Sequence, residues 1–155
     1  MDRSPKYGLL EAKLKIEAYC AYQERCDQEV RKKLQSWNMD SEHIDILISD
    51  LISNNFMNEE RFAEAFVSGK FRIKKWGRIR IKRELKFRKI SDYSINKAMA
   101  QIDDQEYIQT LKTLIEKKEV KGKSKWDKQA KLKRYLANKG YENDLINEFL
   151  LQMEN

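Results

Sequence analysis

Residues 30–51 read VRKKLQSWNMDSEHIDILISDL, and the same pattern returns at 81–102 as IKRELKFRKISDYSINKAMAQI and at 133–153 as KRYLANKGYENDLINEFLLQM. A spacing of 51 residues superimposes the three segments without a gap. The aligned apolar positions are Leu34, Leu85 and Leu136; Met39, Ile90 and Tyr141; Ile44, Ile95 and Ile146; Ile48, Met99 and Leu150; Leu51, Ile102 and Met153. An internal repeat of this length is typical of a protein built from tandem structural units.

Each segment predicts two helices that are separated by a tight turn. Asn38, Lys89 and Gly140 share the place where the first helix would end, and Asn and Gly enter the left-handed conformation most easily. Lys89 suits that place least. The apolar residue that follows is expected to pack back on the aligned leucine, as in a Schellman motif. Side chains able to cap the second helix come next: Asp40 and Ser41, Ser91 and Asp92, Glu142 and Asn143.

A further helix is predicted before each pair, over about residues 11–24, 58–71 and 104–118, with Asn58 as the cap of the second. With one proline and five glycines in 155 residues, the composition favours helix, and we expect no sheet. The predicted fold is all-α, with three tandem three-helix repeats of helix-turn-helix type in an elongated array. The predicted repeats span residues 9–54, 56–102 and 104–153.

Positive charge is concentrated in two blocks. Residues 70–89 carry eleven basic residues and one acid, whereas residues 1–69 have a net charge of −4. Solvated helix faces normally mix signs, so we prefer polyanion binding to a merely solvated face. The predicted DNA- or filament-binding residues are Lys70, Arg72, Lys74, Lys75, Arg78, Arg80, Lys82, Arg83, Lys86 and Arg88. Of these, Arg78, Lys82, Arg83 and Lys86, together with Lys89, are expected to point largely toward solvent.

The second block, residues 117–134, carries nine basic residues and two acids. A solubilising loop is nearly as good an interpretation here as a contact surface. The candidate residues of this second basic patch are Lys121, Lys123, Lys125, Lys128 and Lys131. Trp76 and Trp126 lie in the links before the helix pairs, and we favour buried anchors over base stacking for both.

Several classes of protein are disfavoured. His43 is the only histidine, and we expect it on the surface or in a capping region; no phosphate-binding glycine loop or zinc spacing is present. Cys20 and Cys26 predict two reduced, partly buried thiols on helices. We therefore expect no catalysis, metal or cofactor. The start lacks the apolar stretch of a signal peptide, which predicts a cytoplasmic chain without membrane contact, and we expect a monomer.

A base-reading helix-turn-helix protein is one alternative. The second helix of that motif enters the major groove and needs basic or amide side chains. Here the second helices are acidic or mixed, with Asp45 and Asp50 in the first repeat and Asp144 and Glu148 in the third. This distribution favours contact with a backbone or a filament over base reading. A scaffold without affinity for polyanions is a further alternative.

The stretch NEERFAEAFV at 58–67, followed by basic residues, Gly77, RIKREL at 80–85 and Ile90, resembles the central signature of the RecX family of recombinase regulators. The helix triplets resemble the tandem repeats of that family, and the similarity covers roughly residues 12–153. Two positions depart from the family pattern: Asn58 stands where an acid is usual, and Lys89 where glycine is usual.

The resemblance implies a modulator that lies in the groove of a RecA filament and dampens ATP hydrolysis, strand exchange and the co-protease activity of the SOS response. It also implies direct binding to single- or double-stranded DNA. Several weak contacts along one filament would combine through effective concentration. A sequence-nonspecific DNA-binding helical-repeat protein that acts without a recombinase stays open as an alternative.

Overall fold

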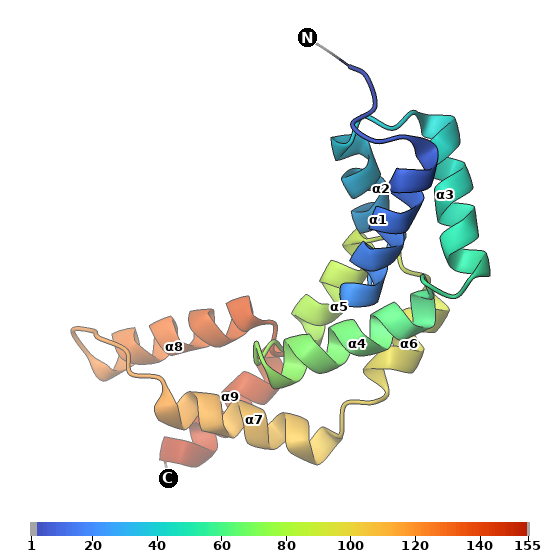
Figure 1. Ribbon diagram of the computed structural model, residues 1–155. Helices are drawn as coiled ribbons and strands as arrows, with labels where there is room; N and C mark the ends of the chain where they lie inside the picture. The colour runs from blue at the N-terminus through green and yellow to red at the C-terminus, as the bar shows by residue number, and fades with distance from the viewer. Residues whose placement is uncertain (1–2, 155) are drawn as a thin grey trace. The chain divides into compact units, whose positions relative to one another are not determined.

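The structure is a computed structural model that describes residues 3–154, and in that range every regular element is an α-helix (Figure 1). The first repeat contains α1 (Leu9–Tyr22), α2 (Asp27–Ser36) and α3 (Ser41–Ser53), and the second α4 (Glu59–Arg72), α5 (Arg78–Phe87) and α6 (Asp92–Met99). The third contains α7 (Asp104–Lys117), α8 (Lys125–Lys139) and α9 (Asn143–Glu154). The expected all-α fold with tandem three-helix repeats is therefore confirmed. The side chain of Met153 lies outside the described residues.

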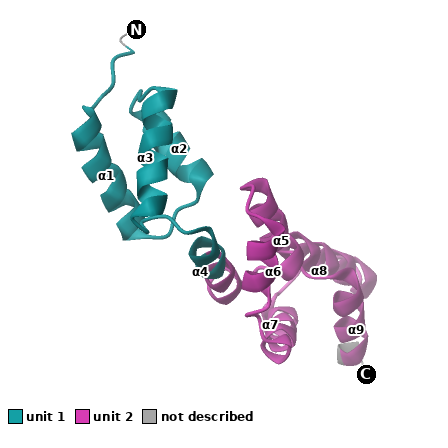
Figure 2. Cartoon of the chain, turned by 90° about the vertical axis from the view of Figure 1, so that its right-hand side faces the viewer, with its two compact units in different colours: residues 1–65 teal, residues 66–155 magenta. Residues whose placement is uncertain are grey.

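The chain divides into two compact units, residues 1–65 and 66–155, and the boundary falls inside α4 (Figure 2). Within the first unit, α1, α2 and α3 pack on one another. Within the second unit, α5 packs on α6, α8 packs on α9, and α7 contacts α9. The units therefore do not coincide with the predicted repeats.

The turn between the paired helices has the same backbone geometry in all three repeats. Asn38, Lys89 and Gly140 have positive φ angles of 58°, 60° and 106°. The amide of the next residue donates to the carbonyl five residues earlier at 3.2 Å in each case, to Leu34, Leu85 or Leu136. These are the bonds of a Schellman motif, as the sequence predicts. Lys89 occupies the left-handed conformation despite its side chain.

The starts of the second helices follow the prediction in two repeats. Asp40 accepts a hydrogen bond from the amide of His43 at 2.9 Å and lies 3.2 Å from Nδ1 of that residue, so the histidine does lie in a capping region. Ser91 caps α6 in the same way. In the third repeat α9 begins at Asn143, and the carboxylate of Glu142 bonds to side chains elsewhere in the second unit.

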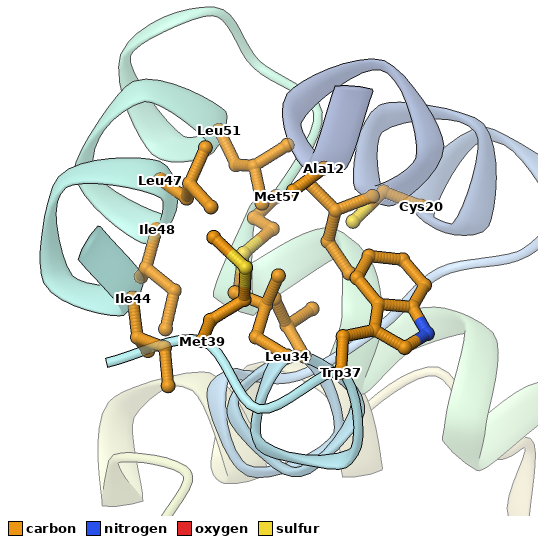
Figure 3. Close-up of a cluster of buried hydrophobic side chains, with 12 residues drawn as sticks. Ala12, Cys20, Leu34, Trp37, Met39, Ile44, Leu47, Ile48, Leu51 and Met57 are labelled. Carbon is orange, nitrogen blue, oxygen red and sulfur yellow. The ribbon is translucent and has the colours of Figure 1, made fainter. Parts of the chain in front are cut away.

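The core of the first unit is formed by apolar side chains from α1, α2, α3 and the segments that join them (Figure 3). Leu34 and Ile16 are fully buried in it, and Trp37 stacks edge-on against Tyr7. Both thiols are free and buried, and burial raises the pKa of Cys20 to about 11. The thiols are thus buried more deeply than the partial burial that the sequence predicts.

Arg61 and Asn58 fix the start of α4 within the first unit. The amide side-chain oxygen of Asn58 accepts from the backbone of Arg61 at 2.9 Å, which confirms the predicted cap. The Arg61 guanidinium donates to the Glu24 carboxylate, to Oδ1 and the carbonyl of Asn55, and to the carbonyl of Phe56. This arginine of the signature therefore ties together the ends of α1 and α3.

Candidate polyanion-binding surface

Two glycines bring the start of α5 against the end of α8. A Cβ atom on Gly77 would lie 2.3 Å from the carbonyl carbon of Gly140, and one on Gly140 would lie 2.4 Å from Cβ of Arg80. The amide of Gly77 donates to the Lys139 carbonyl at 2.8 Å, and the amide of Ile79 donates to the Gly140 carbonyl at 3.0 Å. Only glycine permits this approach of two backbones.

This junction gathers five cations, which we call the cation cluster: Lys74, Lys75, Arg80, Lys118 and Lys139. Their side chains and backbones are held by neutral acceptors and rings. Nζ of Lys139 donates to the Lys74 carbonyl at 2.9 Å, Arg80 donates to the Asn138 carbonyl at 3.4 Å, and Nζ of Lys118 lies 4.4 Å from the centre of the Tyr135 ring. Tyr141 donates to the Lys75 carbonyl at 2.9 Å.

The charges of the cation cluster repel one another. Partial burial, and then the nearby charges of the other four members, lower the pKa of Lys139. Among the described residues no carboxylate lies within 4.0 Å of a charged group of the cluster. A group of cations without acidic partners produces a positive potential that attracts anions.

Trp76 contacts two cations of the second unit, Arg80 of the cation cluster and Lys70, which lies outside the cluster. Arg80 Cζ is 4.0 Å from the Trp76 ring centre and Nζ of Lys70 is 4.9 Å away, both in range for cation–π interactions. The Trp76 ring also packs edge-on against Phe66 at 6.4 Å. Trp76 is half-buried and packs on Phe66, so the predicted buried anchor is only partly buried.

The outward side of α5 extends the positive surface. We call Lys82, Arg83 and Lys86 the α5 cations. All three are exposed, as predicted, and no salt bridge to them exists among the described residues. Ile79 and Phe87, which are 50% and 71% exposed, lie on the same side of the helix. This side of α5 thus combines cations with apolar side chains that a partner can cover.

The side chain of Arg78 is predicted to point toward solvent, but in the structure it is paired within the second unit. Its guanidinium pairs with Asp104 and with Glu142 and stacks on the Tyr107 ring at 3.9 Å. The backbone amide of Arg78 donates to the Tyr107 hydroxyl at 3.0 Å, and that hydroxyl donates to Glu142. Arg78 therefore holds α5, α7 and α9 together, and its charge is compensated within the second unit.

Two more of the predicted binding residues are paired inside the second unit. Arg88 bonds to Glu84 at 3.0 Å and lies over the Phe66 ring. Arg72 lies 3.9 Å from Glu106 in an exposed pair, which holds it only weakly. Conversely, Lys118 and Lys139 are absent from the predicted set. The sequence signal for them was weak, because each becomes part of the positive surface only through the junction of α5 with α8.

The five predicted lysines of the second basic patch are all exposed. The acid nearest to them, Asp127, accepts from the Lys123 amide at 3.1 Å and pairs with Lys131 at 3.4 Å. The hydrogen bond from that amide, followed by the positive charge of Lys131, lowers the pKa of Asp127. Trp126, predicted to be a buried anchor, is instead 78% exposed, so that prediction is wrong.

The described residues form neither a metal site nor a membrane-spanning helix. Within residues 3–154 there is no group of three or more His, Cys, Asp or Glu side chains placed to hold a metal ion. None of the described helices is both long enough and apolar enough to cross a membrane.

Family comparison agrees with the repeat structure. A model of the second three-helix domain of RecX matches residues 58–99, and a model of the third three-helix domain of RecX matches residues 104–150. The chain belongs to the RecX family. Together the two RecX matches cover more than half of the chain, including α5 and all five residues of the cation cluster.

Individual RecX proteins are similar over most of this chain. The regulatory protein RecX of Oceanobacillus iheyensis is 30% identical over 139 residues, which are 88% of this chain and 51% of that protein. RecX of Clostridium perfringens strain 13 is 29% identical over 84% of this chain and 63% of its own length. The chain thus spans about half to two thirds of the length of these relatives.

Two solved structures share the fold. The crystal structure of RecX from Lactobacillus salivarius is 25% identical, with a TM-score of 0.75 over 94% of this chain and 96% of that one. A second crystal structure, of a regulatory protein RecX, has a TM-score of 0.81 at 18% identity, over 91% of this chain and 72% of that one. The second likeness concerns the fold alone.

Proposed function

We propose that this chain is a regulatory protein that binds RecA–DNA filaments in their groove and mainly inhibits the recombinase, ATPase and co-protease activities of RecA. Membership of a family of regulatory proteins supports this proposal, because the relatives carry the name regulatory protein RecX. The observation that carries it is the positive surface of the second unit, where the cation cluster and the α5 cations lack carboxylate partners among the described residues.

The mechanism that we propose is electrostatic attachment to the phosphates of the filament. Each phosphate that a lysine or arginine neutralises releases counterions, and this release favours binding without reading base sequence. Paired cations contribute less, because an internal carboxylate already compensates them. We therefore assign the phosphate contacts to the cation cluster and the α5 cations, and we exclude Arg78, whose two carboxylate partners are internal.

The test compares a charge reversal on α5 with one at the equivalent position of the first repeat. Arg83→Glu should weaken binding to RecA filaments and flatten its salt dependence, with a slope change of about 0.9 for each lost contact to duplex phosphate. Lys32→Glu is the matched control, because Lys32 lies 51 residues earlier, at the same place in its repeat, and is also exposed. The triple reversal of the α5 cations should abolish inhibition of filament ATPase.

The same measurement on naked DNA separates the proposal from its alternative. A filament regulator binds the nucleoprotein filament more tightly than either single-stranded or double-stranded DNA of equal length. Equal affinity for filament and naked duplex, without any change in RecA ATPase, would instead support a nonspecific DNA-binding protein. An unchanged salt slope in the triple variant would refute the assignment of the contact to α5.

A further inference from the structure

The start of α8 combines a hydrogen-bonded turn with an exposed aromatic side chain. Gly122 lies so close to α8 that a Cβ atom there would be 2.6 Å from a carboxylate oxygen of Asp127 and 2.9 Å from Cγ of Lys128. Ser124 accepts from the Asp127 amide at 3.0 Å, and Nζ of Lys131 donates to the Lys121 carbonyl at 2.8 Å. These contacts fix the segment before α8 without using Trp126.

Trp126 therefore has no packing role that accounts for it. It is 78% exposed, whereas Trp37 is 8% exposed and Trp76 is packed against Phe66. Burial of a tryptophan side chain is strongly favourable, so a tryptophan that stays in solvent in the first turn of α8 points to a partner that covers it.

The residues beside Trp126 indicate the chemistry of that partner. At 100° per residue, Ala130, Lys133, Arg134 and Ala137 follow Trp126 along one side of α8. Lys133 and Arg134 are exposed, and Lys133 lies about 10 Å along the helix axis from Trp126. The alanine side chains are small, so they leave no bulky group between the Trp126 ring and the two cations. We call these five residues the α8 stripe.

We infer that the α8 stripe binds single-stranded DNA, with an unpaired base stacked on Trp126 and the backbone phosphates held by Lys133 and Arg134. Stacking platforms flanked by cations are the usual solution for strands without sequence preference. A duplex keeps its bases stacked inside, so their faces are not available to an exposed ring, and the site distinguishes the two forms of DNA. This inference concerns naked DNA and does not depend on the proposed recombinase partner.

A membrane surface is the competing partner for tryptophan beside lysines. A helix that lies in a bilayer interface needs a broad apolar face. In α8 Trp126 is the only exposed large apolar side chain, and its neighbours on the stripe are alanines and cations. A single aromatic ring surrounded by cations can stack on one base, but it does not provide the broad apolar face that contact with acyl chains requires.

Titration of the full chain with an oligo-dT strand, followed by tryptophan fluorescence, tests the inference. We expect saturable quenching of the Trp126 emission. This quenching should be lost in Trp126→Phe, in which only Trp37 and Trp76 still emit. Trp126→Ala should weaken oligo-dT binding by about fivefold to about a hundredfold, while Trp126→Phe keeps most of the affinity because phenylalanine also stacks. A hairpin duplex with the same number of phosphates should bind both variants as it binds the native chain.

The cations have their own control. Lys133→Ala with Arg134→Ala should flatten the salt dependence of oligo-dT binding by a slope of about 0.7 for each contact, with the quenching at saturation retained. Equal loss of strand and hairpin binding in Trp126→Ala would overturn the inference. The inference would also be overturned if Trp126 fluorescence responded to vesicles of anionic phosphatidylglycerol and not to oligo-dT. Either result leaves the filament test on Arg83 unaffected, because that test uses other residues and contains RecA.

Discussion

Replacement of Gly77 by alanine tests the contact on which the positive surface depends. The new methyl group would lie 2.3–2.5 Å from the carbonyl carbon and oxygen of Gly140 and from the amide nitrogen of Tyr141. All three are backbone atoms, so no side-chain rotation can relieve the overlap. The start of α5 must instead move away from the end of α8.

The cost of that movement follows from the bonds at the junction. Separation breaks the hydrogen bonds from the amides of Gly77 and Ile79 to the carbonyls of Lys139 and Gly140, each with a net contribution of about 1 kcal/mol. Residual overlap adds roughly 1–3 kcal/mol. We therefore expect Gly77→Ala to lower the free energy of unfolding by about 3–5 kcal/mol. That change corresponds to a fall in melting temperature of roughly 6–20 °C for a chain of this size.

Gly69→Ala is the matched control, because Gly69 lies inside α4 and a Cβ atom there meets nothing within 4 Å. Alanine in a helix interior should raise stability by about 0.5–1 kcal/mol. Urea unfolding followed by circular dichroism measures both variants. If Gly77→Ala proves as stable as Gly69→Ala, the close approach of the two backbones is wrong, and so is the position of Arg80 beside α8.

Two further predictions concern the turn of the second repeat and the buried tyrosines. Lys89→Gly should stabilise the chain by about 0.5–1 kcal/mol, because a lysine at φ 60° is strained; Asn38→Gly should gain less in the same thermal melts, and an equal gain would contradict this account. Burial, reinforced for Tyr107 by Glu142, raises the pKa values of Tyr107 and Tyr141 above the ordinary 10.0. The folded state therefore holds these protons longer than the unfolded state, so the stability they contribute is full below about pH 10 and is lost as the pH rises further. Unfolding midpoints measured above about pH 10 should fall with pH in the native chain and fall less steeply in Tyr107→Phe. An equally steep fall in both proteins would show that Tyr107 does not contribute to the pH dependence of stability.

The helices and their ends could be predicted from the sequence because local rules determine them. The spacing of 51 residues identified the leucines at 34, 85 and 136, and each accepts the bond that closes its helix. Capping depends on residues two or three apart in the chain, so Asp40, Ser91 and Asn58 were placed correctly. In the third repeat α9 begins at Asn143, directly after Glu142, and the Glu142 carboxylate bonds to Arg78 and Tyr107.

The positive surface could be predicted only in part, because pairing of charges is decided by contacts between distant residues. Arg78 lies in the most basic stretch of the chain, yet one of its partners, Glu142, is 64 residues away. Lys118 and Lys139 come together with Arg80 only when α5 meets α8. The sequence predicts a buried Trp126 because tryptophan usually packs, whereas in the structure its side chain is exposed at the start of α8.

The way in which the cation cluster is held explains why its charge remains available to a partner. Lys139 and Arg80 donate to carbonyl oxygens, and Tyr141 fixes the backbone of Lys75, so neutral groups supply the geometry. A carboxylate in the same place would hold the cations equally well but would cancel their field and compete with any incoming phosphate. Because the acceptors are neutral, an anion gains the full attraction of the cluster and also relieves the repulsion among its members. Binding of a polyanion should therefore stabilise the junction of α5 with α8 itself, which couples the rigidity of the second unit to occupation of its surface.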